Sequence, residues 1–69
     1  MKTEIYEADP FTNQKTAHFL TVETDYRFEQ RDEFFLTTDK GQKLKVRVTY
    51  VRVEVSPTGL RRELIVMKL

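Results

Sequence analysis

The sequence predicts an all-β domain in which a single small antiparallel sheet of five strands curls into a barrel. Residue usage favours sheet, because the chain has nine threonines and seven valines but only two alanines, and β-branched residues suit a pleated surface better than a helix. The second observation is an alternation of apolar and polar residues between Lys43 and Val55. The apolar positions change from even to odd numbers along this stretch: Leu44, Val46, Val48, Tyr50, Val51, Val53 and Val55.

This alternation indicates a half-buried strand, since successive side chains of a strand point to opposite faces. The phase changes near Thr49–Val51 without a glycine or proline. It therefore predicts either a β-bulge at that point or a strand that passes from one packing surface to another. Either one bends the sheet, and a bent sheet in so short a chain favours a small barrel.

Turn residues separate the apolar runs and so divide the chain into elements. Asp9-Pro10, Asp39-Lys40-Gly41 and Ser56–Gly59 predict turns, because proline fixes φ, aspartate bonds the backbone ahead of it and glycine takes the left-handed position of a hairpin turn. The predicted strands are Lys2–Ala8, Thr16–Thr24, Asp32–Thr38, Lys43–Val55 and Leu60–Leu69.

Two of these segments need further interpretation. Residues 25–31 are charged around Tyr26 and Phe28, and we expect an irregular connection whose aromatic rings fold back as a lid over one end of the core. The last segment also fits a helix, through Leu60, Leu64 and Met67. We favour a strand there, because Leu64-Ile65-Val66 is a β-type run and the short turn before it invites an antiparallel partner.

Five antiparallel strands with one long, kinked member are typical of SH3-like and OB-like barrels. The stretch Phe28–Leu36, followed by a turn and Lys43–Val55, resembles such barrels, in which an acidic turn precedes a strand and a hairpin. Arg31-Asp32 stands where these barrels usually carry Gly-Asp. The resemblance covers about half of the chain and names no family.

Length and composition limit the class of protein. Sixty-nine residues predict one β domain, 1–69, with a thin core. The chain has no cysteine, which excludes disulfides and thiolate-bound zinc and suits a reducing compartment. The sequence contains no run of 18 apolar residues that could span a membrane, and Met1–Ala8 lacks the apolar segment of a signal peptide. We therefore expect a cytoplasmic protein, of the kind that phages and mobile elements often encode as accessory proteins.

Charge is distributed unevenly along the chain. Up to Asp39 there are four basic and nine acidic residues, and from Lys40 onward there are eight basic and two acidic ones. One interpretation is that acidic strands of the first half lie beside basic strands of the second. The other is a bipolar surface that presents a basic face to an anionic partner. We favour the first, because folding the sheet brings the two halves together.

Catalytic chemistry finds little support in the sequence. Ser56 is the only serine and His18 the only histidine, so nucleophilic catalysis rests on one unconvincing pair. The carboxylates Asp25, Glu29, Asp32 and Glu33 alternate with arginines, which predicts paired and solvated acids. The two glycines stand apart in turns, so no phosphate-binding loop is present. We expect no enzyme activity, no cofactor and no metal site.

Protein binding is the preferred function. Residues 60–69 carry apolar side chains on both faces of the predicted strand, and the odd-numbered set is Ile65, Met67 and Leu69. If the chain itself does not cover them, this strand offers an apolar edge to a foreign protein or to a second copy. If the barrel curls around the strand, no such edge exists. The expected partner is another protein, and dimerisation through the last strand is part of this hypothesis.

Nucleic-acid binding is the alternative. Cations spaced along a strand can follow a phosphate backbone, and the second half of the chain supplies several of them. The same residues also serve as a solvated face that keeps a sheet from aggregating. The candidate residues for this alternative are Lys43, Lys45, Arg47, Arg52, Arg61 and Arg62.

Overall fold

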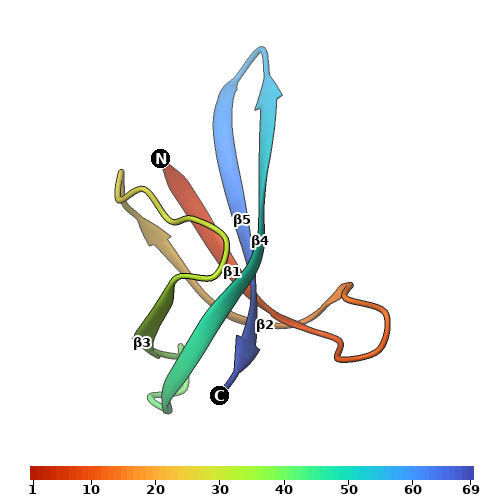
Figure 1. Ribbon diagram of the computed structural model, residues 1–69. Helices are drawn as coiled ribbons and strands as arrows, with labels where there is room; N and C mark the ends of the chain where they lie inside the picture. Colours follow the sequence, from red (N-terminus) through yellow and green to blue (C-terminus); the bar gives the residue numbers. More distant parts are fainter.

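A computed structural model describes the whole chain, residues 1–69, as five β-strands and no helix. The strands form one sheet in the order β2-β1-β5-β4-β3 (Figure 1). Their bounds agree with the predicted segments to within a residue or so, and the last segment is a strand, as favoured. The bounds are β1 Lys2–Ala8, β2 Lys15–Glu23, β3 Glu33–Thr37, β4 Lys43–Ser56 and β5 Gly59–Lys68.

The sheet is mixed, which corrects the prediction of a purely antiparallel one. Three of its four pairs are antiparallel, but β1 runs parallel to β5, with Lys2 opposite Arg61 and Glu7 opposite Val66. The chain forms the β1–β2 hairpin, crosses to the far edge and returns through β3 and β4. The last strand therefore arrives beside the first in the same direction. All-β architecture and curling into a small SH3-like or OB-like half-barrel are confirmed.

A β-bulge in β4 is also confirmed at its predicted place. The register with β5 shifts between Val48 and Tyr50, so Thr49 is the extra residue. Val48 lies opposite Val66 and Val51 lies opposite Leu64. Because paired residues point to the same face of an antiparallel sheet, valines on both sides of the bulge share one face, which we call the core face. The opposite side of the sheet is the outer face.

The hydrophobic core lies on the core face and is small. Its buried members come from all five strands: Ile5, Phe19, Leu36, Val46, Val48, Leu64 and Val66. The connection 24–32 closes one end of it, because the Phe28 ring packs against this cluster and lies 5.1 Å from the Phe34 ring. The predicted aromatic lid therefore exists, formed by Phe28, while Tyr26 stays largely exposed.

The half-barrel is nearly open between its edge strands β2 and β3. Beyond the sheet ladders, one backbone hydrogen bond joins these two sides, in which Asp39 N–H donates to the Phe19 carbonyl at 2.9 Å. The β4–β5 hairpin, by contrast, extends well past the rest of the sheet (Figure 1). Every residue from Arg52 to Arg61 is exposed, so the far half of this hairpin lies outside the core.

Candidate interaction surfaces

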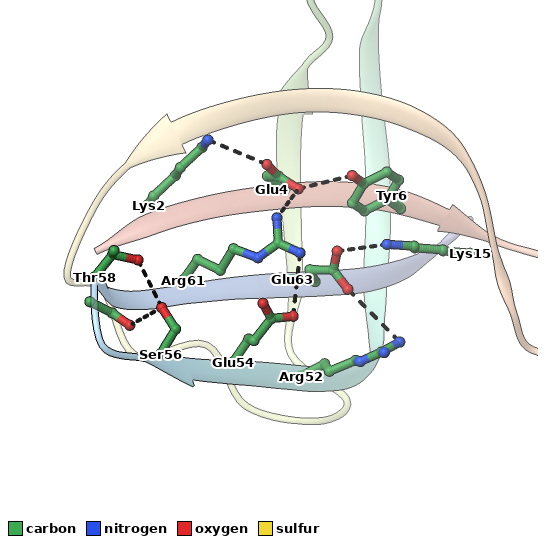
Figure 2. A network of polar contacts seen from close by, with 11 residues as sticks. Lys2, Glu4, Tyr6, Lys15, Arg52, Glu54, Ser56, Thr58, Arg61 and Glu63 are labelled. Carbon is green, nitrogen blue, oxygen red and sulfur yellow. Dashed lines mark hydrogen bonds and ion pairs between the residues drawn. The ribbon is translucent and has the colours of Figure 1, made fainter.

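An ion-pair network covers the outer face of β1, β5 and β4 (Figure 2). Glu4 lies near its centre and accepts a hydrogen bond from the Tyr6 hydroxyl at 2.9 Å, with Lys2 and Arg61 at 3.7 and 4.0 Å. This hydrogen bond lowers the pKa of the Glu4 carboxyl and raises the pKa of the Tyr6 hydroxyl. The first and last strands are thus held together by charge as well as by their backbones.

Glu63 occupies the middle of the same face and is almost fully buried. Its carboxylate accepts a hydrogen bond from Lys15 Nζ at 2.7 Å and lies 4.0 Å from a guanidinium nitrogen of Arg52. The carboxylate raises the pKa of the Lys15 ammonium. Since a buried charge needs a close partner, Lys15 on β2 is placed to neutralise an acid on the central strand.

The predicted basic face of β4 is mostly neutralised by one acid of β3. Glu33 lies 2.9 Å from Arg47 and 3.8 Å from Lys45, and hydrogen bonding from Arg47 lowers the pKa of the Glu33 carboxyl. Lys43 makes no ion pair. These contacts agree with the interpretation that acids of the first half of the chain lie beside bases of the second, as do Glu4–Arg61 and Glu7–Lys68.

The other three candidate cations do not extend this basic face. Arg61 donates to Glu54 at 3.3 Å, a contact that raises the pKa of its guanidinium, and Arg52 lies beside Glu63. Arg62 is buried on the core face, opposite to Arg61, where it donates to Thr3 Oγ1 at 3.0 and 3.2 Å. Arg62 is therefore wrong as a candidate residue of an exposed basic face, because neighbouring residues of a strand point to opposite faces and Arg62 points to the core.

Of the three predicted protein-binding residues, one is buried and two are exposed. Ile65 is fully buried, because β5 is a central strand and the half-buried Tyr6 and Tyr50 lie opposite Ile65 on its two neighbours. The chain itself therefore covers β5 between Arg61 and Val66, and this part of the strand offers no apolar edge to a partner. Met67 and Leu69 are 43% and 53% exposed, as proposed for a binding surface.

Sequence reasoning considered Phe35 as a stacking platform for nucleic acid but did not place it near these two residues. Phe35 is 71% exposed and lies opposite Lys45, and Lys45 in turn accepts the backbone hydrogen bond of Leu69 on its other side. Phe35, Met67 and Leu69 therefore lie along one end of the outer face, and we call them the outer-face patch. The signal was present, since Phe35 falls on the polar parity of β3, between Glu33 and Thr37.

A second group of exposed apolar residues lies on the projecting hairpin. Val53, Val55 and Leu60 are 53%, 75% and 49% exposed. Val55 is opposite Leu60 in the β4–β5 ladder, and Val53 is two residues before it, so the three share the core-face side of the hairpin beyond the core. The outer side of the same segment carries Arg52 and Glu54.

Residues considered for catalysis are not brought together. His18 contacts Tyr6, Thr21 and Asp39, whereas Ser56 lies at the hairpin turn, beside Thr58. A cleft of about 360 Å³ next to His18 is lined by Ala17, His18 and Phe19 of β2 and by polar residues of the turn after β3. Another, of about 330 Å³, lies beside the Phe28 lid and is lined by three aromatic residues, Tyr26, Phe28 and Phe34, and by Asp32 and Glu33.

The four neighbouring carboxylates are each engaged separately. Asp25 pairs with the amino group of Met1, Glu29 with Arg27 and Glu33 with Arg47. Asp32 accepts a hydrogen bond from the Glu29 backbone amide. No three histidine, aspartate or glutamate side chains are grouped as metal ligands would be, and the fold contains no helix that could cross a membrane.

No family model, curated protein or solved structure matches this chain.

Proposed function

We propose that this protein is a non-enzymatic binding module that acts through protein–protein interaction. The observation that carries the proposal is the outer-face patch, in which Phe35, Met67 and Leu69 are 71%, 43% and 53% exposed on the two sides of β4. Exposed apolar side chains next to polar ones are typical of protein interaction sites. Here Lys45 and Arg47 of β4 lie between Phe35 and the two residues of β5, and Glu33 lies beside Arg47.

The patch favours a partner with an apolar anchor and an acidic border. Phenylalanine and methionine are among the residue types enriched at protein interfaces. Lys45 Nζ lies 5.9 Å from the centre of the Phe35 ring and leaves one face of this ring to be covered by a ligand. A peptide or loop with an apolar side chain next to a carboxylate has the matching chemistry.

The test is affinity capture with matched variants. The full chain is immobilised as wild type, as the double variant Phe35→Ser/Met67→Ser and as the control Phe11→Ser, which alters a 95% exposed ring in the β1–β2 turn. We expect a protein from the native host to bind the wild type and the control but not the double variant, with similar thermal unfolding of all three. Equal capture by the double variant would contradict the proposal.

Nucleic-acid binding stays the second candidate, because one observation favours it. Phe35 is an exposed ring beside Lys45, with Lys43 and Arg47 at the neighbouring positions of the same face, and single strands bind where an aromatic ring is flanked by cations. Titration with single-stranded and duplex oligonucleotides at low and physiological salt tests it. Affinity should fall steeply with salt and disappear in Lys45→Glu/Arg47→Glu; no binding at low salt contradicts this candidate.

We also propose a cytoplasmic location. It is supported by the absence of cysteine from a small, thin-cored domain, since domains of this size in oxidising compartments usually rely on disulfides. Fractionation of the native host with an antibody against this chain tests the location, and recovery from an extracellular or periplasmic fraction would contradict it.

A further inference from the structure

The edge of β4 is open beyond Val48. On this side β3 pairs with Lys43–Arg47, and Val48 exchanges backbone hydrogen bonds with Asp32 and Arg31 at 2.8 Å. From Tyr50 to Ser56 no strand pairs with this edge, and the segment belongs to the part of the hairpin that extends away from the sheet (Figure 1). An unpaired edge of this length is a template for another strand.

The backbone groups that point to this edge can be identified from Val48. Its side chain faces the core, and its N–H and C=O point to the β3 side. Along a strand, side-chain face and hydrogen-bonding edge alternate together. Val51, Val53 and Val55 also carry core-face side chains, so their N–H and C=O groups point to the open edge, where no strand of this chain meets them.

The sequence at this edge is complementary to itself. In an antiparallel pair centred on Val53, each Val53 lies opposite its equivalent and Val51 lies opposite Val55 of the second copy. All three positions are then hydrogen-bonded pairs, which makes a continuous ladder. On the outer face, Arg52 lies opposite Glu54 of the second copy, twice by symmetry. Opposite charges at directly facing positions stabilise a sheet.

Neighbouring registers are unfavourable. Moving the centre of the pair by one residue keeps the hydrogen-bonding pattern but places Arg52 opposite Arg52, or Glu54 opposite Glu54, of the second copy. Like charges directly opposite each other destabilise strand pairing. The segment 50–56 has neither lysine nor proline, the residues that usually protect an exposed edge. Charge therefore selects one symmetric register.

We propose that two copies of this chain pair through Val51–Val55 of β4, in an antiparallel and twofold-symmetric dimer with a continuous sheet. The dimer also explains why Val53 and Val55 are so exposed in one copy, because the valine rows of the two copies then lie side by side. It uses a different surface from the outer-face patch and does not depend on the function proposed for that patch.

The test is a charge exchange read by oligomeric state. Light scattering after size exclusion and analytical ultracentrifugation from micromolar to millimolar concentration should find a dimer of the wild type. Arg52→Glu and Glu54→Arg each create two like-charge contacts and should weaken dimerisation by roughly tenfold or more. The double variant Arg52→Glu/Glu54→Arg should restore it. Arg27→Glu, a change in the exposed connection, should have no effect.

Mixing the two single variants gives the sharper result. A strand with acids at both positions matches a strand with arginines at both, so the mixture should form a one-to-one heterodimer at concentrations at which each variant alone is mostly monomeric. A fold defect in either variant cannot produce this rescue. The proposal is overturned if the wild type is monomeric throughout, if either single variant dimerises as the wild type does, or if the mixture does not associate.

Discussion

The guanidinium of Arg62 lies over the ring of Phe28, with its central carbon 5.3 Å from the ring centroid. The same side chain donates hydrogen bonds to Thr3 Oγ1 and, at 3.3 Å, to the Thr24 carbonyl. A single buried arginine thus joins the first strand, the central strand and the connection 24–32. It forms part of the core lid, although its residue type suggests a surface cation.

Arg62→Lys should therefore destabilise the fold even though the substitution keeps the positive charge. A lysine cannot stack flat on Phe28 or make the forked contact with Thr3, and it leaves buried oxygens less well satisfied. We expect the free energy of unfolding to fall by about 1–3 kcal/mol. Chemical denaturation measures it, with Arg61→Lys on the exposed outer face as the control, where a much smaller change is expected because exposed ion pairs contribute little. Equal losses would contradict the role of Arg62.

Val48 and Val55 both lie on the core face, but only Val48 belongs to the hydrophobic core. A charged side chain should therefore destabilise the fold at Val48 and have little effect at Val55. Val48 is 1% exposed and Val55 is 75% exposed. Val48→Asp buries an unpaired carboxylate and should unfold the domain, since this costs several kcal/mol out of a typical stability of about 5–15 kcal/mol. Val55→Asp should retain a native circular dichroism spectrum. A folded Val48→Asp would contradict the core assignment.

The Lys15–Glu63 pair should show strong coupling. Lys15→Met leaves the Glu63 carboxylate buried with only the more distant Arg52 nearby, and we expect a lower free energy of unfolding. Adding Glu63→Gln removes the buried charge and should recover part of this loss. A double-mutant cycle from urea denaturation measures the coupling; additive losses would show that the two side chains act independently.

The Tyr6–Glu4 hydrogen bond should make the free energy of unfolding depend on pH in both the acidic and the alkaline range. The pKa of Glu4 is lowered in the fold, so its contribution is present above the ordinary value of 4.5 and is lost as pH falls through the lowered pKa. The pKa of Tyr6 is raised, so its contribution is present below the ordinary value of 10.0 and is lost as pH rises through the raised pKa.

Tyr6→Phe removes both effects at once. We expect the variant to be less stable than the wild type at neutral pH and the difference to shrink towards acid and towards alkali. Thermal unfolding across the pH range measures it. Arg47→Met is the comparison, because it removes the partner that lowers the pKa of Glu33 and should reduce only the acid dependence. A difference that is constant with pH would contradict the role of this hydrogen bond.

Local pattern was sufficient for the strands and the bulge but not for the order of the sheet. The phase change around Thr49 is a property of consecutive residues, and turn residues mark each hairpin. The parallel contact of Lys2 with Arg61 joins the two ends of the chain, and no local periodicity encodes which distant strands meet. The antiparallel assignment was wrong there for this reason.

The candidate surfaces were predictable only in part. Alternation would have separated Arg61 from Arg62, since Arg62 shares its parity with the buried Leu64 and Val66. It could not show that Ile65 is buried while Met67 is exposed, because both have the same parity. That difference depends on neighbours, since β1 pairs with β5 only as far as Val66.

The bulge at Thr49 decides to which face of the sheet each later side chain of β4 points. If Thr49 continued the regular alternation instead of being bulged out, Arg52 and Glu54 would turn to the core-face side of the hairpin, and Val53 and Val55 to the outer side. The conformation of one half-buried residue thus decides whether the projecting hairpin carries apolar or charged side chains on its core-face side. Deletion of Thr49 alone would therefore straighten this part of β4 and leave the valines on their present side, because the pairs before and after the bulge would then follow each other directly.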